Sequence, residues 1–275
     1  MSNILIATHD IIDAATLTGA NVDGAYPVTN AQTDPPAEVV RASATTMQIN
    51  VDLGQSTASP ESYPSINIVG CLYNNAAAAA TWRVRGADAE ADFTSSPEAQ
   101  GYDSGAVSLW TESDYDEYDR VHSLILPGGQ SYRFWQIDFA SITSAFQFGR
   151  LLIDAAYQPT RNAAPGLQLS VVDFSIGHDT VTGHRRVKGK QQKSMVASFP
   201  FRYEAEGFDN LLKLDQVAGN TGAVFVSLDP ASRIMERSLY GTIAGSSELD
   251  HGIYNVASGG NLYSKRYQFL EIEAP

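Results

Sequence analysis

The sequence predicts a mainly β chain of two domains, a β-sandwich followed by a small α+β domain. Short stretches in which apolar and polar residues alternate with period two recur along the first half, as in strands with one buried face. The segment Tyr157–Gly166 holds two prolines and a glycine without apolar periodicity, which is typical of a linker. The charge also changes there, because residues 1–160 carry 6 Lys and Arg against 19 Asp and Glu, whereas the remainder carries 12 against 12.

These observations predict domain boundaries. We expect the first domain at 1–157, a linker at 158–166 and the second domain at 167–275. No fixed-period repeat is visible, which argues against a solenoid.

The first domain is expected to be a β-sandwich. Its clearest strand is Met47–Leu53, where alternation stops at Gly54. In Thr81–Arg85 the same alternation places Trp82 and Val84 on one face, which we expect to be buried because two arginines occupy the other. Further strands are expected at 65–70, 107–110, 123–126, 131–139 and 146–153. Long amphipathic helices between these strands, which a parallel α/β fold would need, are missing.

The second domain combines strands with one helix. The helix is expected at 204–218, where Phe208, Leu211, Leu212 and Leu214 follow helical spacing and Gly219 provides a stop. Acidic residues near its start suit the helix dipole. Strands are expected at 167–176, 194–203, 223–227, 237–244 and 262–273.

Composition excludes several classes of protein. With 43% apolar residues the chain can bury a core, so general disorder is excluded. No apolar run approaches the roughly 18–20 residues that span a bilayer, and the first residues do not resemble a secretory signal. The single cysteine, Cys71, excludes an internal disulfide and is expected to be buried. A net charge of −13, all of it in the first 160 residues, argues against nucleic-acid binding there.

Five segments of the first domain carry a family resemblance. They are Val39–Ser43, Ile49–Gly54, Thr81–Arg85, Tyr132–Asp138 and Phe148–Ile153. Their order and their Asp-Leu-Gly, Trp-Arg-Val and Phe-Gly-Arg motifs resemble the galactose-binding-like, or discoidin-type, jelly roll. The resemblance implies a jelly-roll β-sandwich.

The same motifs are similar to the version of this domain in tail proteins of long-tailed bacteriophages. Segments of the second domain resemble the phage tail-tip pattern in order: Gly183–Arg186, Phe199–Tyr203, Phe208–Ala218, Gly219–Gly222, Leu228–Pro230, Arg237–Ile243 and Tyr267–Glu273. The resemblance implies a structural protein of the tail tip or baseplate, similar to distal tail proteins, with an α+β tail-ring-type second domain. Such a protein is made in the bacterial cytoplasm and resides in the virion. It forms a homo-oligomeric ring, with a hexamer as one size, that joins the tail tube to the distal tail proteins.

No catalytic residue is predicted. The chain lacks Gly-x-Ser-x-Gly, His-Glu-x-x-His and phosphate-loop motifs, and its five histidines show no ligand spacing. We therefore expect a non-enzyme without a cofactor, with no nucleic-acid partner and no membrane insertion.

An acidic run at 112–119 leaves alternatives open. Asp114, Asp116 and Asp119 could hold a structural calcium ion, although a loop motif is missing and a solvated loop is favoured. If the jelly roll is instead a carbohydrate-binding module for host adhesion, the stacking faces are expected from three aromatic residues: Trp110, Tyr115 and Tyr118. A glycan-cleaving enzyme that uses these carboxylates is the least favoured reading.

A basic cluster at 184–193 is the candidate assembly site. Arg185, Arg186, Lys188 and Lys190 lie in a predicted hairpin without interleaved aromatic residues, which argues against base stacking. We expect this hairpin either to be solvated or to dock on an acidic face of a neighbouring subunit.

Overall fold

The computed structural model describes the chain apart from residues 1–2, 9, 55–62, 95–99, 111–120, 175, 180–184, 189–190, 256–259 and 273–275, and without side chains for the remaining residues of 175–190 and 252–260. The chain is mainly β, as predicted. It divides into two compact units. The sandwich unit consists of His9–Ala156 with Arg233–Glu236, and the sheet unit of Met1–Thr8, Tyr157–Ser232 and Arg237–Glu273.

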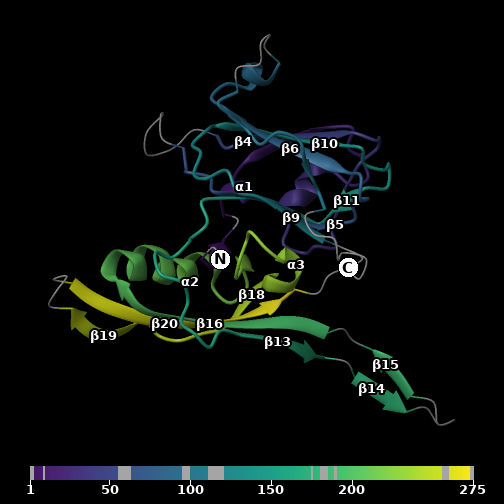
Figure 1. Cartoon of the computed structure of the whole chain (residues 1–275). Helices are drawn as coiled ribbons and strands as arrows, with labels where there is room; N and C mark the ends of the chain where they lie inside the picture. The colour runs from purple at the N-terminus through teal and green to yellow at the C-terminus, as the bar shows by residue number, and fades with distance from the viewer. Residues whose placement is uncertain are drawn as a thin grey trace. The chain divides into compact units, whose positions relative to one another are not determined.

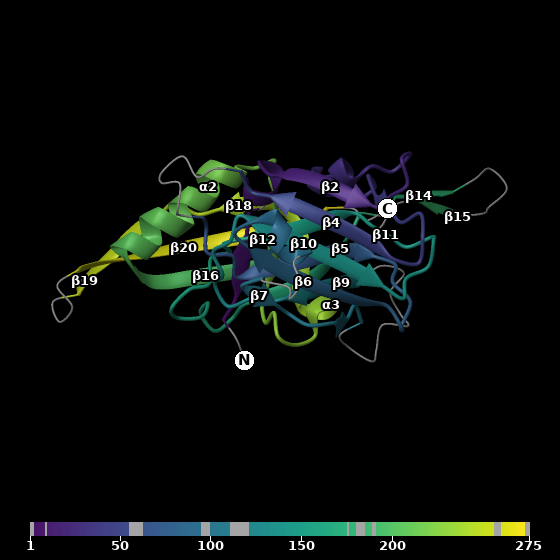
Figure 2. The ribbon, with the colours of Figure 1, turned by 90° about the horizontal axis from the view of Figure 1, so that it is seen from above.

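The sandwich unit contains two main antiparallel sheets (Figure 2). The larger has the order β2 (Thr16–Ala20), β4 (Met47–Asp52), β10 (Phe134–Ala140), β6 (Thr81–Ala87) and β7 (Tyr102–Asp103), with β8 (Val107–Ser108) also paired to β6. The smaller has the order β12 (Arg150–Asp154), β5 (Ile68–Asn74) and β9 (Val121–Ile125). A short pair joins β11 (Gln147–Phe148) to β3 (Val40–Arg41). The described part of the unit also contains short helical segments: α1 (Asp10–Asp13), η1 (Val28–Gln32), η2 (Glu90–Phe93) and α3 (Ile234–Arg237).

The predicted alternation forms the core of the sandwich. Met47, Ile49 and Val51 on β4 are buried while their neighbours are partly exposed. Trp82 is 1% exposed and stacks on Phe139 with ring centroids 6.2 Å apart. One cluster of buried apolar residues draws on both sheets, so the sheets pack face to face around a shared core.

The motifs that resemble the jelly-roll family hold this scaffold together. The carboxylate of Asp52 accepts two hydrogen bonds from Arg133, at 2.7 and 2.8 Å, and one from the backbone N–H of Gly54 at 2.8 Å. Gly54 has a φ of +75°, a conformation that favours glycine, which explains the Asp-Leu-Gly motif. The Arg133 guanidinium also holds the pKa of Asp52 below its usual range.

The Phe-Gly-Arg motif has a similar structural basis. A Cβ on Gly149 would lie 2.5 Å from the backbone oxygen of Pro36, so only glycine fits there. Arg150 is fully buried and its Nη2 lies 2.5 Å from Asp13 Oδ1. These side chains serve the scaffold and do not by themselves indicate a ligand.

The sheet unit is built on one antiparallel sheet (Figure 1). Its order is β1 (Leu5–Ala7), β17 (Ala223–Ser227), β18 (Ser238–Ser246), β20 (Gly260–Glu271), β16 (Gln191–Tyr203) and β13 (Gln168–Asp173), and β19 (Asp250–Asn255) also pairs with β20. The predicted helix is present as a π-helical segment, η4 (Glu206–Leu212), that continues into α2 (Lys213–Ala218). Leu211, Leu214 and Ala218 pack against buried residues of β16 and β20, so this helix covers one face of the sheet. Beyond β13 the chain forms a hairpin of β14 (Ile176–Asp179) and β15 (Arg185–Lys188).

The structure differs from the predicted boundaries in two places. Leu5–Ala7, which we expected in the first domain, pairs with β17 of the sheet unit. The predicted linker also belongs to that unit, where the Asn3 side chain donates to the Pro159 carbonyl at 2.7 Å and the Ala164 N–H to that of Ser198 at 2.8 Å. Period-two patterning reports local strands but not which distant strand each one pairs with, so it could not place these segments.

Candidate functional site: the edge and ends of the sheet unit

The structure describes only part of the predicted site residues. Arg185, Arg186 and Lys188 lie in β15, so the basic cluster does form a hairpin strand. Six others fall outside the described residues: Lys190, Tyr115, Tyr118, Asp114, Asp116 and Asp119. The calcium prediction is therefore untested, and elsewhere in the described chain no cluster of three His, Cys, Asp or Glu side chains could hold a metal ion.

Trp110 is part of the packing of the sandwich unit. Its indole Nε1 donates to the Ala76 carbonyl at 2.6 Å, and its ring contacts Val121 and Met235. The side chain is half-buried, so only part of the ring could serve as the sugar-stacking face that we predicted.

β13 forms an open edge of the sheet unit. It is the terminal strand of the sheet order and pairs only with β16 among the described strands. All of its residues are exposed except Val172, which is partly buried. Leu169 and Val171 are 44% and 61% exposed, and Phe174, directly after the strand, is 50% exposed. Unpaired backbone donors and acceptors beside exposed apolar side chains are a template for pairing with another chain.

A second apolar group lies at the other end of the sheet. Phe201 and Tyr203, in the last three residues of β16, are 48% and 45% exposed, and Phe208 on η4 is 42% exposed. The Phe208 ring packs edge-on against Tyr263 of β20, with centroids 5.1 Å apart. We call this group, with the start of β19, the β19 end, and we call Leu169, Val171 and Phe174, with the β14–β15 hairpin, the hairpin end. Figures 1 and 2 both show β19 and the hairpin at opposite ends of the sheet.

The backbone at Phe201 is strained. Its φ is +55°, and the strand pairing shifts here. Between the pairs Phe199–Lys265 and Arg202–Tyr263, two residues of β16, Pro200 and Phe201, stand opposite the single residue Ser264 of β20. A bulky residue in the left-handed region is uncommon, and this conformation costs free energy. The strain at this exposed phenylalanine makes Phe201 a candidate for a contact with another molecule.

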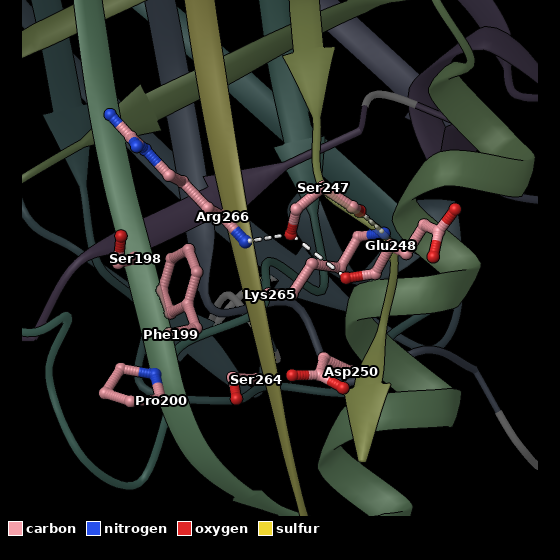
Figure 3. Close-up of a pocket in the computed structure, with 9 residues that line it drawn as sticks. All are labelled: Ser198, Phe199, Pro200, Ser247, Glu248, Asp250, Ser264, Lys265 and Arg266. Atoms are coloured by element: carbon pink, nitrogen blue, oxygen red, sulfur yellow. Dashed lines mark hydrogen bonds between the residues drawn. The ribbon is translucent and has the colours of Figure 1, made fainter. Parts of the chain in front are cut away.

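A groove of about 460 Å³ lies next to this bulge (Figure 3). Its lining comes from β16, β20, the connection between β18 and β19, and the first residue of β19. It consists of Ser198, Phe199, Pro200, Ser247, Glu248, Asp250, Ser264, Lys265 and Arg266. Glu248 and Asp250 are exposed, and neither carboxylate has an ion-pair partner in the part of the chain that the structure describes. Figure 3 shows the Arg266 guanidinium directed away from both carboxylates.

Lys265 lies at the bottom of the groove and is held in place by neighbouring groups. It is 4% exposed, and its Nζ lies 2.5 Å from Asp215 Oδ2 of α2 and donates to the Ser247 carbonyl at 2.9 Å. The Ser247 hydroxyl accepts from the Arg266 N–H at 2.9 Å. Lys265 therefore fastens the helix and the β18–β19 connection to β20, and its charge is already compensated by Asp215.

The helix is fastened at its other end by Glu206. Its Oε1 accepts from the Tyr157 hydroxyl at 2.9 Å and from the Thr160 N–H at 3.0 Å. Burial, and then the Glu206 charge, raise the pKa of Tyr157 far above its ordinary value, so its phenol stays protonated as a donor. This network is structural and supplies no reactive group.

The sandwich unit has a smaller hollow of about 140 Å³ on the outer face of its larger sheet. Polar side chains of Thr16, Thr18, Asn50, Asp52 and Glu90 line it together with Phe93 and Phe134. Asn50 Oδ1 accepts from Gln136 Nε2 at 2.8 Å, so part of this polar rim is already paired within the protein.

Sequence reasoning missed the groove, the exposed edge and this hollow. Each depends on which strands are neighbours in the sheet. The sequence of β19, whose first residue lines the groove, does not alternate between apolar and polar residues, so this strand was not predicted. The exposed Leu169 and Val171 could have been noticed only as apolar residues in a strand, a pattern that equally fits burial.

No protein-family model and no curated protein matches the chain. Among solved structures it is similar to a fucose-binding module of Streptococcus pneumoniae (11% identity, TM-score 0.36, covering 53% of this chain and 94% of the module). It is similar to the lectin domain of lectinolysin in complex with Lewis b antigen (12% identity, TM-score 0.36, 55% and 98%). It is also similar to a chitosan-binding module of a Paenibacillus chitosanase/glucanase (13% identity, TM-score 0.34, 52% and 96%).

Those modules bind sugars, and at such identities and TM-scores the likeness assigns no ligand to this chain. None of the comparisons shows a phage tail protein. Among the described residues no helix is long and apolar enough to cross a membrane.

Proposed function

We propose that the chain is a structural protein that assembles head to tail with copies of itself through the sheet unit, as in a ring at a bacteriophage tail tip. The observation that carries the proposal is the β13 edge, which among the described strands pairs on one side only and exposes Leu169 and Val171. Natural sheets usually cover, shorten or charge such an edge, because it otherwise invites aggregation. A second copy of the chain that pairs with or covers this edge would prevent such aggregation.

The distribution of exposed apolar side chains supports a head-to-tail contact. Among the residues whose side chains the structure describes, nine large hydrophobic residues are exposed. Seven of them belong to the sheet unit, and six of these gather at its two ends. Two different patches at opposite ends can meet only between copies, in a heterologous contact. Such a contact closes into a ring when the rotation between copies allows it. The tail-tip location comes from the sequence resemblance alone.

A lysine placed on the exposed edge of β13 tests this proposal. Val171→Lys should leave the fold intact, since the side chain is 61% exposed and exposed substitutions usually change stability by about 0.5 kcal/mol or less. It should shift the sedimentation profile from oligomer toward monomer, because a lysine on an edge strand blocks pairing. Leu126→Lys is the matched control, since Leu126 is 42% exposed in the sandwich unit and should leave assembly unchanged. Equal effects of the two variants would contradict the proposal.

Sugar binding by the sandwich unit is the second candidate, favoured by its polar hollow. Hydroxyl, amide and carboxylate groups around Phe93 and Phe134 suit the hydroxyls and the apolar face of a sugar ring. The three solved structures described above, to which the chain is similar, are all sugar-binding modules.

A glycan array tests this second candidate. Thr18→Val removes a hydroxyl from the hollow without changing its volume, so it should abolish any glycan signal, whereas Trp110→Phe should keep it. Loss with Trp110→Phe and retention with Thr18→Val would place the sugar at the predicted aromatic site instead. No signal from the unmodified chain would reject sugar binding.

A further inference from the structure

The groove at the β19 end carries negative charge that no ion pair within the described chain neutralises. Glu248 and Asp250 line it without an ion-pair partner among the described residues, while Lys265 is held by Asp215. The Arg266 guanidinium points away from the two carboxylates (Figure 3). The acidic side of the groove therefore presents uncompensated negative charge, bordered by the hydroxyls of Ser247 and Ser264.

The opposite charge lies at the hairpin end. Strand β15 contains Arg185, Arg186 and Lys188, and its partner strand β14 contributes one acidic residue, Asp179. The β14–β15 hairpin therefore has a net positive charge in a half of the chain whose charges otherwise sum below zero.

The two features cannot meet within one copy. β13, which leads into the hairpin, pairs with the first six residues of β16, whereas the groove is lined by Ser198, Phe199 and Pro200 further along the same strand. The hairpin and β19 lie at opposite ends of the sheet (Figures 1 and 2), and Asp250 at the start of β19 lines the groove. A second copy, placed head to tail, brings the hairpin of one next to the groove of the other.

We propose that the β14–β15 hairpin of one copy docks into the acidic groove formed by β16, β20, the β18–β19 connection and the start of β19 of the next copy. The inference rests on the proposed head-to-tail assembly and adds to it the pair of surfaces that set its direction. Guanidinium and ammonium groups meet the carboxylates of Glu248 and Asp250 in charge-assisted hydrogen bonds. Complementary charges of this kind fix register and speed encounter.

Charge reversal on both sides tests the pairing. A hairpin variant carries Arg185→Glu, Arg186→Glu and Lys188→Glu, and a groove variant carries Glu248→Lys and Asp250→Lys. Each variant alone should weaken assembly at least tenfold at low salt, because like charges then face each other. Mixed in equal amounts they should assemble again, since every contact in an alternating oligomer pairs opposite charges. Native mass spectrometry identifies that alternating species, and thermal melting checks that each variant is folded.

The outcomes separate this inference from the proposed function. If the unmodified chain is a monomer, both fail. If it assembles and the reversed variants assemble equally well, the proposed function stands and the docking is wrong. If each variant assembles poorly and the mixture does not assemble either, the hairpin and the groove contact something other than each other. The proposed docking is then again wrong.

Discussion

Replacing Trp82 with alanine will lower the free energy of unfolding by about 3–5 kcal/mol, as for other large aromatic residues truncated in cores. Trp82 is 1% exposed and stacks on Phe139 within the cluster that joins the two sheets of the sandwich unit. The loss is a large share of the roughly 5–15 kcal/mol that holds a domain folded. Urea denaturation of the full chain, followed by fluorescence of the remaining tryptophans, measures it.

Trp82→Phe is the control for this prediction. The indole Nε1 of Trp82 is buried and has no hydrogen-bond partner among the residues that the structure describes, so removing it leaves none of their polar groups stranded. We expect this variant to retain most of the stability that Trp82→Ala loses. An unchanged midpoint for Trp82→Ala would reject the core position of this side chain and the register of β6.

Replacing Lys265 with methionine will destabilise the sheet unit by about 3 kcal/mol. Removing one partner of a buried ion pair typically costs about 3–5 kcal/mol, and we expect the lower end because the Asp215 side chain is 26% exposed. The substitution also removes the hydrogen bond to the Ser247 carbonyl, which fixes the edge of the groove. Thermal and urea denaturation both report the loss.

The double variant Lys265→Met, Asp215→Leu separates charge from packing. Replacing a whole buried pair with apolar residues is often close to neutral, so this variant should recover most of the lost stability. If it is as unstable as Lys265→Met alone, the ion pair is not the source of the effect.

Local sequence patterns predicted the strands that alternate and the helix that buries one stripe. β4 and β17 lie where expected, and the predicted helix is present, although its first part is π-helical. The strand expected at 65–70 instead spans Ile68–Asn74, because every residue of β5 is buried and period two disappears in a strand covered on both faces.

Long-range pairing set the limit of sequence reasoning. Nothing in Leu5–Ala7 indicates a partner more than 200 residues away in β17. The same limit hid the groove, whose residues come from three separate segments, and the exposure of Val171 at the edge of the sheet. The basic hairpin was predicted because its charges are close together in the sequence, whereas the groove that we propose as its docking surface is assembled only by the fold.

The most direct test of the account is the mass of the unmodified chain in solution. Light scattering coupled to size-exclusion chromatography at low salt, over a range of protein concentrations, should give one closed species of several copies of the 29.6 kDa chain. A ring has a fixed mass because its last contact uses up the last free edge, so raising the concentration should not make it larger. A monomer of 29.6 kDa at every concentration would contradict head-to-tail assembly, and with it the structural role proposed for this protein.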